Sequence, residues 1–116
     1  MSNSQALRAT SIAVQTVAFG SLTNAFVALG AAMPEPIRIL KINNTTDADI
    51  YISFDGTTNN DVVVASSGMV LDVTTNKSVE QGMFLKQGTV FYVKYITAPT
   101  SGNVYLSAYY AVNNNK

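Results

Sequence analysis

Short runs of alternating hydrophobic and polar residues fill most of the chain, and turn-forming residues separate them. In residues 89–96, for example, Phe91, Val93 and Tyr95 fall on one side of an extended strand and Lys94 falls on the other. A hydrophobic period of two residues is typical of a half-buried β-strand. The same criterion predicts strands at residues 12–19, 25–29, 37–42, 49–54, 62–65, 69–73, 82–85, 89–96 and 103–112.

Turn signals follow these runs at regular intervals. Asn43 to Thr46, Asp55-Gly56, Gln87-Gly88 and residues 99–102 are rich in the residue types that favour turns. Short strands at intervals of about 8–12 residues, separated by such turns, are typical of a sandwich or small barrel. We therefore predict an all-β fold, an antiparallel β-sandwich or jelly roll of about eight strands.

The first 36 residues differ from the rest of the chain. They contain more alanine and fewer turn signals, and Pro34 and Pro36 interrupt regular structure because proline lacks a backbone donor. The run at 12–19 changes phase near Gln15, which could mark a bulge, and residues 23–32 are also compatible with a helix. We predict one domain overall, with an N-terminal extended arm and leading strands in residues 1–36 and a sandwich body in residues 37–116.

The composition favours a component of an assembly over a free monomer. Hydrophobic residues make up 47% of the 116 positions and charged residues only 12%, where about a quarter is usual. A surface this poor in charge is expected to face another protein. No apolar run is long enough to cross a bilayer, and the N-terminus lacks the pattern of a signal peptide, so we expect no membrane partner and synthesis in the cytoplasm.

Charge and residue chemistry exclude several functions. The seven basic residues are scattered and the formal net charge is zero, so no nucleic-acid partner is expected. The absence of Cys and His removes most nucleophile–base pairs and the usual zinc sites. Paired carboxylates could in principle hydrolyse glycosidic bonds, but the sequence does not supply the required separation. We expect no enzyme, no cofactor and no metal.

Four aspartates form the one acidic cluster, and they allow two interpretations. Carboxylate oxygens are ligands that Ca²⁺ prefers, although the spacing does not match an EF-hand loop. Asp side chains also stabilise turns by accepting hydrogen bonds from nearby backbone N–H groups, and we favour this second interpretation. The residues are Asp47, Asp49, Asp55 and Asp61.

Apolar and tyrosine side chains provide the candidate interface. Tyrosine combines an apolar ring with a polar tip, which suits sheet packing, protein interfaces and, less often, sugar binding. The apolar members come from the predicted arm, and the tyrosines come from the body. The candidate interface residues are Ile12, Val14, Val17, Phe19, Tyr51, Tyr105 and Tyr109.

Three segments carry a resemblance to a known class of proteins. Ile39 to Gly56 (ILKINNTTDADIYISFDG), Leu85 to Lys94 (LKQGTVFYVK) and Ser101 to Leu106 (SGNVYL) are similar to a pattern found in small virion proteins of tailed bacteriophages. The shared pattern is structural: strand, Asn/Asp turn, strand, then Gln-Gly turn and strand. The resemblance implies a non-enzymatic virion structural protein, present in many copies, whose partners are copies of itself and portal, capsid or tail proteins.

Two hypotheses of function follow. In the first, the chain is a component of the head–tail junction (a collar or adaptor protein) or of the tail, with residues 11–19 buried against another chain; a capsid decoration or cement protein is the alternative position. The sparse charges slightly favour the junction, since a ring there can bury most of its surface. In the second, the tyrosine-bearing strand face or the loop from Asp55 to Asp61 binds a glycan or a host surface.

Overall fold

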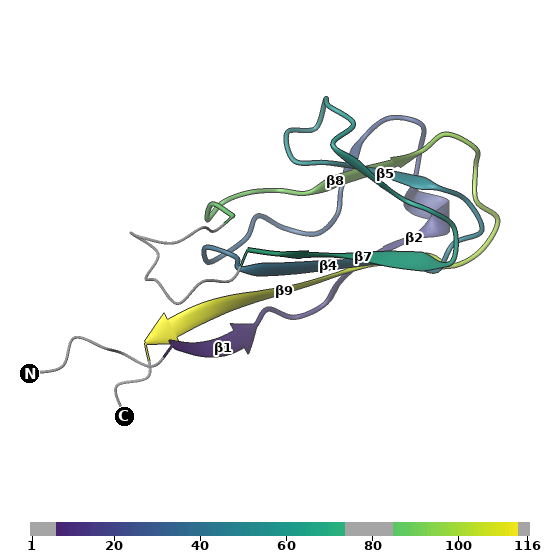
Figure 1. The fold of residues 1–116 in the computed structure, drawn as a ribbon. Helices are drawn as coiled ribbons and strands as arrows, with labels where there is room; N and C mark the ends of the chain where they lie inside the picture. Colours follow the sequence, from purple (N-terminus) through teal and green to yellow (C-terminus); the bar gives the residue numbers. More distant parts are fainter. Residues whose placement is uncertain (1–6, 74–84, 114–116) are drawn as a thin grey trace, which may run out of the picture.

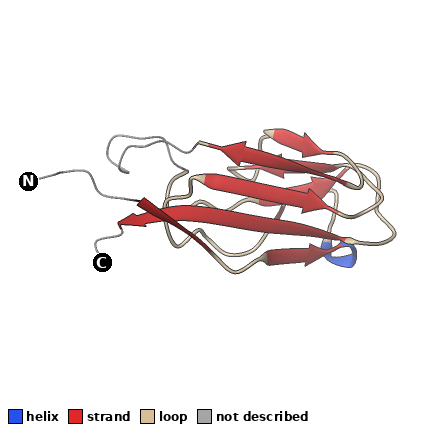
Figure 2. Cartoon of the chain, turned by 60° about the horizontal axis from the view of Figure 1, so that its bottom comes forward, coloured by secondary structure: helices blue, strands red, loops and turns tan. Residues whose placement is uncertain are grey.

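The structure is a computed structural model that describes residues 7–73 and 85–113. These residues form two antiparallel sheets stacked face to face, which confirms the predicted all-β sandwich (Figure 1). One short 3₁₀ turn, η1 (Phe19–Ser21), follows the second strand (Figure 2). The strands are β1 (Leu7–Ser11), β2 (Gln15–Ala18), β3 (Val27–Ala28), β4 (Ile39–Asn44), β5 (Ile50–Ser53), β6 (Asp61–Val63), β7 (Ser67–Asp72), β8 (Tyr92–Tyr95) and β9 (Asn103–Asn113).

The larger sheet is organised around its longest strand, β9. Its order is β1-β9-β4-β7, and β2 also pairs with β9. Leu7 lies opposite Asn113 and Ala18 lies opposite Asn103, so β1 and β2 follow one another along the same side of β9. The other side of β9 pairs with β4, from Ile39 opposite Tyr109 to Asn44 opposite Val104.

The smaller sheet has the order β3-β8-β5-β6. Its central pair joins β5 to β8, with Ile50 opposite Tyr95 and Ile52 opposite Val93. The outer strands are short, since β3 has two residues and β6 has three. The link between β6 and β7 carries the chain from the smaller sheet to the larger one.

The core lies between the two sheets and follows the alternation seen in the sequence. Leu40 and Ile42 of β4 are fully buried, as are Ile50 and Ile52 of β5, while the residues between them are more exposed. Burying each such side chain stabilises the fold by about 1.5–3 kcal/mol. The remaining fully or nearly fully buried hydrophobic side chains of the described cluster are Leu22, Leu29, Met33, Ile37, Val63, Phe91, Val93, Val104, Leu106 and Ala108.

The N-terminal segment of the described chain packs on its own body. Of the strand predicted at 12–19, only residues 15–18 form a strand, β2, because residues 12–14 leave the ladder after β1 and Phe19 begins the 3₁₀ turn. The phase change near Gln15 therefore marks the start of β2. The alternative of a helix at 23–32 is wrong. The backbone there pairs with β8 instead, through Leu29 N–H to Phe91 O at 2.7 Å and Tyr95 N–H to Thr23 O at 3.0 Å.

The strand predicted at 82–85 lies mostly outside the described residues. Only Leu85 is described, and it forms an isolated bridge with Ile37. Its N–H donates to the Ile37 carbonyl at 2.7 Å, and the Ile37 N–H donates to its carbonyl at 2.8 Å. The predicted strand at 89–96 is shorter than expected, but Phe91 and Val93 face the core and Lys94 faces outward, as the alternation indicated.

Candidate interaction surfaces

The seven candidate interface residues lie on three separate parts of the molecule. The apolar four belong to the segment around β2, Tyr51 lies on the smaller sheet, and the other two tyrosines lie on the larger sheet. The sequence therefore identified members of three surfaces rather than one continuous site.

The segment around β2 is only partly exposed. Ile12 and Val17 pack against the core cluster, whereas Val14 and Phe19 are 59% and 40% exposed. The two exposed side chains flank β2, one before it and one after it. They are the members of the apolar set that remain open to contact with another molecule.

The outer face of the larger sheet carries Tyr105 and Tyr109. Both are half-buried, and both alternate along β9 with the buried residues Val104, Leu106 and Ala108. In the register of the sheet, Tyr105 lies between Thr16 of β2 and Asn43 of β4. This face therefore combines aromatic and polar side chains with two charged residues, Lys41 and Asp72.

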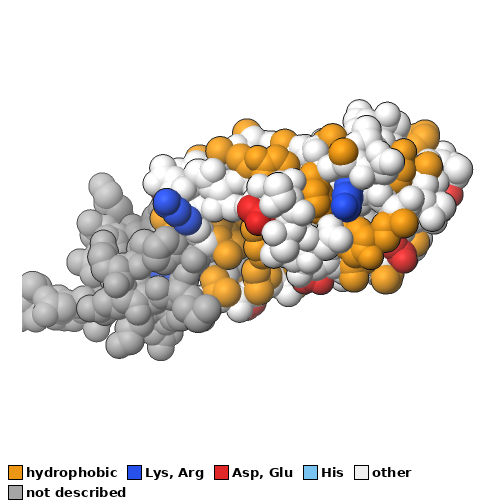
Figure 3. All heavy atoms as spheres, turned by 90° about the horizontal axis from the view of Figure 1, so that it is seen from above, with side chains coloured by type: hydrophobic (Ala, Val, Ile, Leu, Met, Phe, Trp, Pro, Cys, Tyr) orange, Lys and Arg blue, Asp and Glu red, His pale blue; other side chains and the backbone are white. Residues whose placement is uncertain are grey.

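The outer face of the smaller sheet carries Tyr51 in a row of side chains that crosses the sheet. Tyr51 lies opposite Lys94 on one side and Val62 on the other. The Lys94 ammonium lies 4.6 Å from the centre of the Phe26 ring and 6.0 Å from that of Tyr51, so the aromatic faces stabilise this cation. Seen from this side, the surface has broad hydrophobic areas and few charges (Figure 3).

Several exposed apolar residues were not among the sequence candidates. Val62, Val64 and Ile96 on the side of the smaller sheet are 42%, 51% and 62% exposed, and Val70 of β7 is 62% exposed. In a run such as Val62-Val63-Val64, all members are apolar, so the pattern does not say which of them face outward. Only the observed burial of Val63 assigns its two neighbours to the surface.

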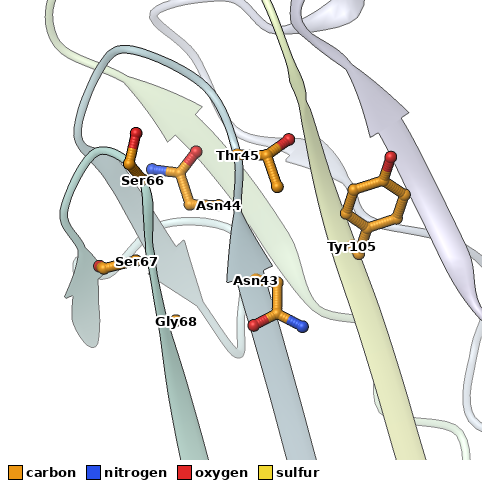
Figure 4. Close-up of a pocket in the computed structure, with 7 residues that line it drawn as sticks. All are labelled: Asn43, Asn44, Thr45, Ser66, Ser67, Gly68 and Tyr105. Atoms are coloured by element: carbon orange, nitrogen blue, oxygen red, sulfur yellow. The ribbon is translucent and has the colours of Figure 1, made fainter.

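A shallow polar depression lies where the end of β4 meets the start of β7 and the side of β9 (Figure 4). The Asn44 amide at its base is nearly fully buried and already used: its Nδ2 donates to the carbonyls of Ala48 at 2.8 Å and Val63 at 2.9 Å, and its Oδ1 accepts from Thr46. The buried amide therefore has a structural role. The depression is lined by Asn43, Asn44, Thr45, Ser66, Ser67, Gly68 and Tyr105.

The four aspartates accept hydrogen bonds from main-chain N–H groups: Asp55 within its own turn, Asp61 from its neighbour Val62, and Asp47 and Asp49 from loops that are distant in the sequence. Asp47 accepts from the backbone N–H of Thr100 at 2.8 Å and from its hydroxyl, and Asp49 accepts from the N–H of Ala65 at 2.9 Å. Asp55 accepts from Thr57 and Thr58 N–H at 2.9 and 2.8 Å. In the described part of the chain, no three Asp, Glu, His or Cys side chains are grouped to hold a metal ion.

Hydrogen bonds lower the pKa of two of these carboxyls. The backbone N–H groups of Thr58 and Thr57, with the Ser53 and Thr58 hydroxyls, hold the pKa of Asp55 far below its usual range. The Thr100 hydroxyl and N–H lower the pKa of Asp47. Donors aimed at a carboxylate favour its charged form, so both residues act as fixed anionic acceptors for their loops.

Comparison with known proteins gives likenesses of fold. No protein-family model and no curated protein sequence matches the chain. A chain of the cyanophage Pam1 capsid asymmetric unit is similar in structure, with a TM-score of 0.52, 14% identity, and coverage of 91% of this chain and 86% of that one. A chain of the acid-stable capsid of Helicobacter pylori bacteriophage KHP30 has a TM-score of 0.50 and 9% identity, covering 94% of this chain and all of that one.

These likenesses extend over nearly the whole sandwich. At identities of 14% and 9% they show a shared fold and carry no information on individual residues. Within the described residues, no helix is long and apolar enough to cross a membrane.

Proposed function

We propose that this chain is a non-enzymatic structural protein of a bacteriophage virion, present in many copies and acting through protein–protein contacts. The observation that carries the proposal is the fold. The sandwich is similar, over 91% and 94% of this chain, to chains of two phage capsids.

The surface supports an assembly role. Charged residues are 12% of the sequence, and exposed valine, isoleucine and phenylalanine side chains lie on both sheets and beside β2. Exposed apolar surface of this kind is typical of proteins that contact other proteins. Of the described polar groups, Asn44 and the aspartates are used in hydrogen bonds within the chain, some inside one loop and some between distant loops.

Within the virion we propose the capsid as the position of this protein. Two solved structures that share its fold, with TM-scores of 0.52 and 0.50, are of phage capsids. The sequence alone had slightly favoured the head–tail junction or the tail, on the basis of sparse charge, and that position is the second candidate. In either position the partners are copies of this chain and neighbouring virion proteins.

Electron microscopy of particles tests this function. Gold-labelled antibodies against the recombinant protein are applied to particles purified from a culture of the organism that encodes the chain. We expect many labels distributed over the head; labels confined to the neck or tail would support the second candidate. Particles that carry neither the label nor peptides of the chain in mass spectrometry would overturn the virion proposal.

A further inference from the structure

The polar depression at the end of β4 contains three hydrogen-bonding groups that the fold does not use. Thr45 is committed, since its hydroxyl donates to the Asn103 carbonyl at 2.9 Å and accepts from the Asn103 N–H at 2.9 Å. By contrast, the Asn43 amide and the Ser66 hydroxyl make no hydrogen bond to any described residue. The Asn103 amide donates to the Tyr105 phenol oxygen at 3.1 Å, which leaves the Tyr105 hydroxyl hydrogen for another acceptor.

These three groups come from different elements that line the same depression. Asn43 belongs to β4, Tyr105 to β9 and Ser66 to the turn before β7, and Figure 4 shows them around Thr45. In the register of the sheet, Tyr105 lies opposite Asn43 and Asn43 lies opposite Gly68. Asn43 and Ser66 are exposed and Tyr105 is half-buried, so a molecule from solution can reach all three.

The fold alone does not account for the residue types in this place. Asparagine and glycine are disfavoured in strands, yet Asn43 lies in β4, which is paired on both sides, and Gly68 lies inside β7 without a positive φ. Ser66 has φ +57°, a left-handed conformation that is usual for glycine and uncommon for serine. Local rules of this kind are broken preferentially at functional sites.

Gly68 leaves room for the Asn43 amide. A Cβ at Gly68 would overlap Asn43 Oδ1 and would lie 3.1 Å from the Ile42 carbonyl oxygen. Any larger residue would therefore push the Asn43 amide out of its present position. Glycine at this site keeps an uncommitted amide at one place on the surface, and it supplies no turn.

We propose that the depression is a binding site for a neutral oligosaccharide. Sugar hydroxyls both donate and accept hydrogen bonds, and the Asn43 amide and the Ser66 hydroxyl offer both functions, while the Tyr105 hydroxyl offers a donor. The Tyr105 ring adds apolar surface on which the C–H face of a pyranose can pack. The volume of the depression, about 550 Å³, is within the range of about 300–1,000 Å³ that is usual for small-molecule sites.

The charge of the site favours a neutral ligand over an acidic one. None of the described residues that line the depression is charged, and the two charged residues of this face, Lys41 and Asp72, lie outside it. A carboxylate or phosphate would lose water there without gaining a cation, which is unfavourable. This binding site is additional to the assembly contacts of the proposed function and does not depend on them.

A glycan array tests the class of ligand. The purified, fluorescently labelled chain is applied to an array that carries neutral, sialylated and sulfated oligosaccharides. We expect binding to a set of neutral glycans. Binding to no neutral glycan, or to acidic glycans only, would overturn the proposal.

Point variants test the place of binding. The neutral glycan with the strongest array signal is titrated into each variant by isothermal titration calorimetry. Asn43→Ala and Tyr105→Phe should each raise the dissociation constant about three- to tenfold, because each removes a hydrogen bond to the ligand. Tyr109→Phe is the matched control, since Tyr109 is half-buried on the same face of β9 and does not line the depression; it should leave the dissociation constant unchanged.

Ser66→Gly separates binding from folding. Glycine adopts a positive φ freely, so the thermal midpoint should be no lower than that of the unmodified chain, whereas loss of the hydroxyl should raise the dissociation constant about threefold. If Asn43→Ala, Tyr105→Phe and Ser66→Gly all bind the glycan as the unmodified chain does, the depression is not the binding site and the proposal is wrong. The measurements use the purified chain, so their result is independent of where particles carry the protein.

Discussion

At the scale of single residues, Asn44 is the clearest polar determinant of the fold. Asn44 is the last residue of β4, and its amide is buried. Through hydrogen bonds it connects its own strand to the β4–β5 turn and to the end of β6. A buried polar group of this kind is stabilising only while all its partners are present. Removing the amide would leave the Ala48 and Val63 carbonyls without this donor.

We predict that Asn44→Ala lowers the free energy of unfolding by about 3 kcal/mol, because buried carbonyls lose their hydrogen-bond donor. Urea denaturation followed by tyrosine fluorescence measures this change. Asn43→Ala is the matched control, because Asn43 precedes Asn44 in the same strand and its side chain is exposed. This variant should change the free energy of unfolding by no more than about 0.5 kcal/mol. If both variants lost the same free energy of unfolding, the buried hydrogen bonds of Asn44 would not stabilise the fold more than an exposed side chain does.

Asp55 predicts a pH dependence. Its pKa is lowered in the folded chain, so the stability that its ionised form contributes is present above the unfolded pKa, near 3.8, and is lost as the pH falls below that value. Asp55→Asn removes this titration, and the variant should therefore show a weaker decline in stability between about pH 5 and pH 2. Urea midpoints measured at a series of pH values test this. Because Asp47 also has a lowered pKa, some decline should remain in the variant; an unchanged slope would exclude the role of Asp55.

At the scale of elements, the contact between the end of β4 and the start of β9 fixes how the larger sheet is assembled. Thr45 N–H donates to the Asn103 carbonyl at 2.9 Å, and Asn103 N–H donates to the Thr45 hydroxyl at 2.9 Å. Gly102, just before β9, has φ +93°, a conformation that side-chain-bearing residues rarely adopt. A Cβ at this position would lie 2.3 Å from the Thr45 carbonyl oxygen.

Gly102→Ala is therefore expected to destabilise the protein by about 2–4 kcal/mol, because it combines backbone strain with a clash against main chain. Thermal unfolding followed by circular dichroism measures the change. Gly20→Ala is the control, because a Cβ at Gly20 would have no atom within 4 Å and Gly20 does not have a positive φ. Its free energy of unfolding should stay within about 0.5 kcal/mol of that of the unmodified chain. If Gly102→Ala were as stable as Gly20→Ala, the close approach of β9 to Thr45 would be wrong.

Elements differ in how well their sequence predicts them. β4, β5 and β8 were predictable because Ile42, Ile52 and Val93 alternate cleanly with more exposed residues. β1 was missed, because the residues of Leu7–Ser11 alternate weakly and the strand exists through its pairing with residues 109–113, a contact that a local pattern does not contain. The Thr23–Ala32 segment has alanines that suit a helix, but burial of Leu29 and its hydrogen bond to Phe91 impose an extended backbone.

At the scale of the whole molecule, composition led to a hypothesis about the class of protein, whereas the position of its exposed residues depended on the sheet arrangement. Sparse charge, and the absence of Cys and His, indicated an assembly protein without catalytic chemistry. The interface candidates depended on knowing which side of each strand faces outward. Of the candidates, Tyr105 and Tyr109 lie on one face of the larger sheet, whereas Tyr51 lies on the smaller sheet; the exposed Val70 was not among the candidates.

The place of β9 in the larger sheet also has a consequence for the order in which the protein can form. β1, β2 and β4 all pair with β9, whereas the ribosome makes β1 and β2 about ninety residues earlier than the strand they need. Until residues 103–113 have been synthesised, the early strands have no ladder to join and their apolar side chains stay uncovered. Folding of the larger sheet is therefore a late event in biosynthesis, dominated by pairings between distant parts of the chain, which are slow to form. A growing chain of this kind keeps apolar strands exposed to aggregation until β9 has emerged.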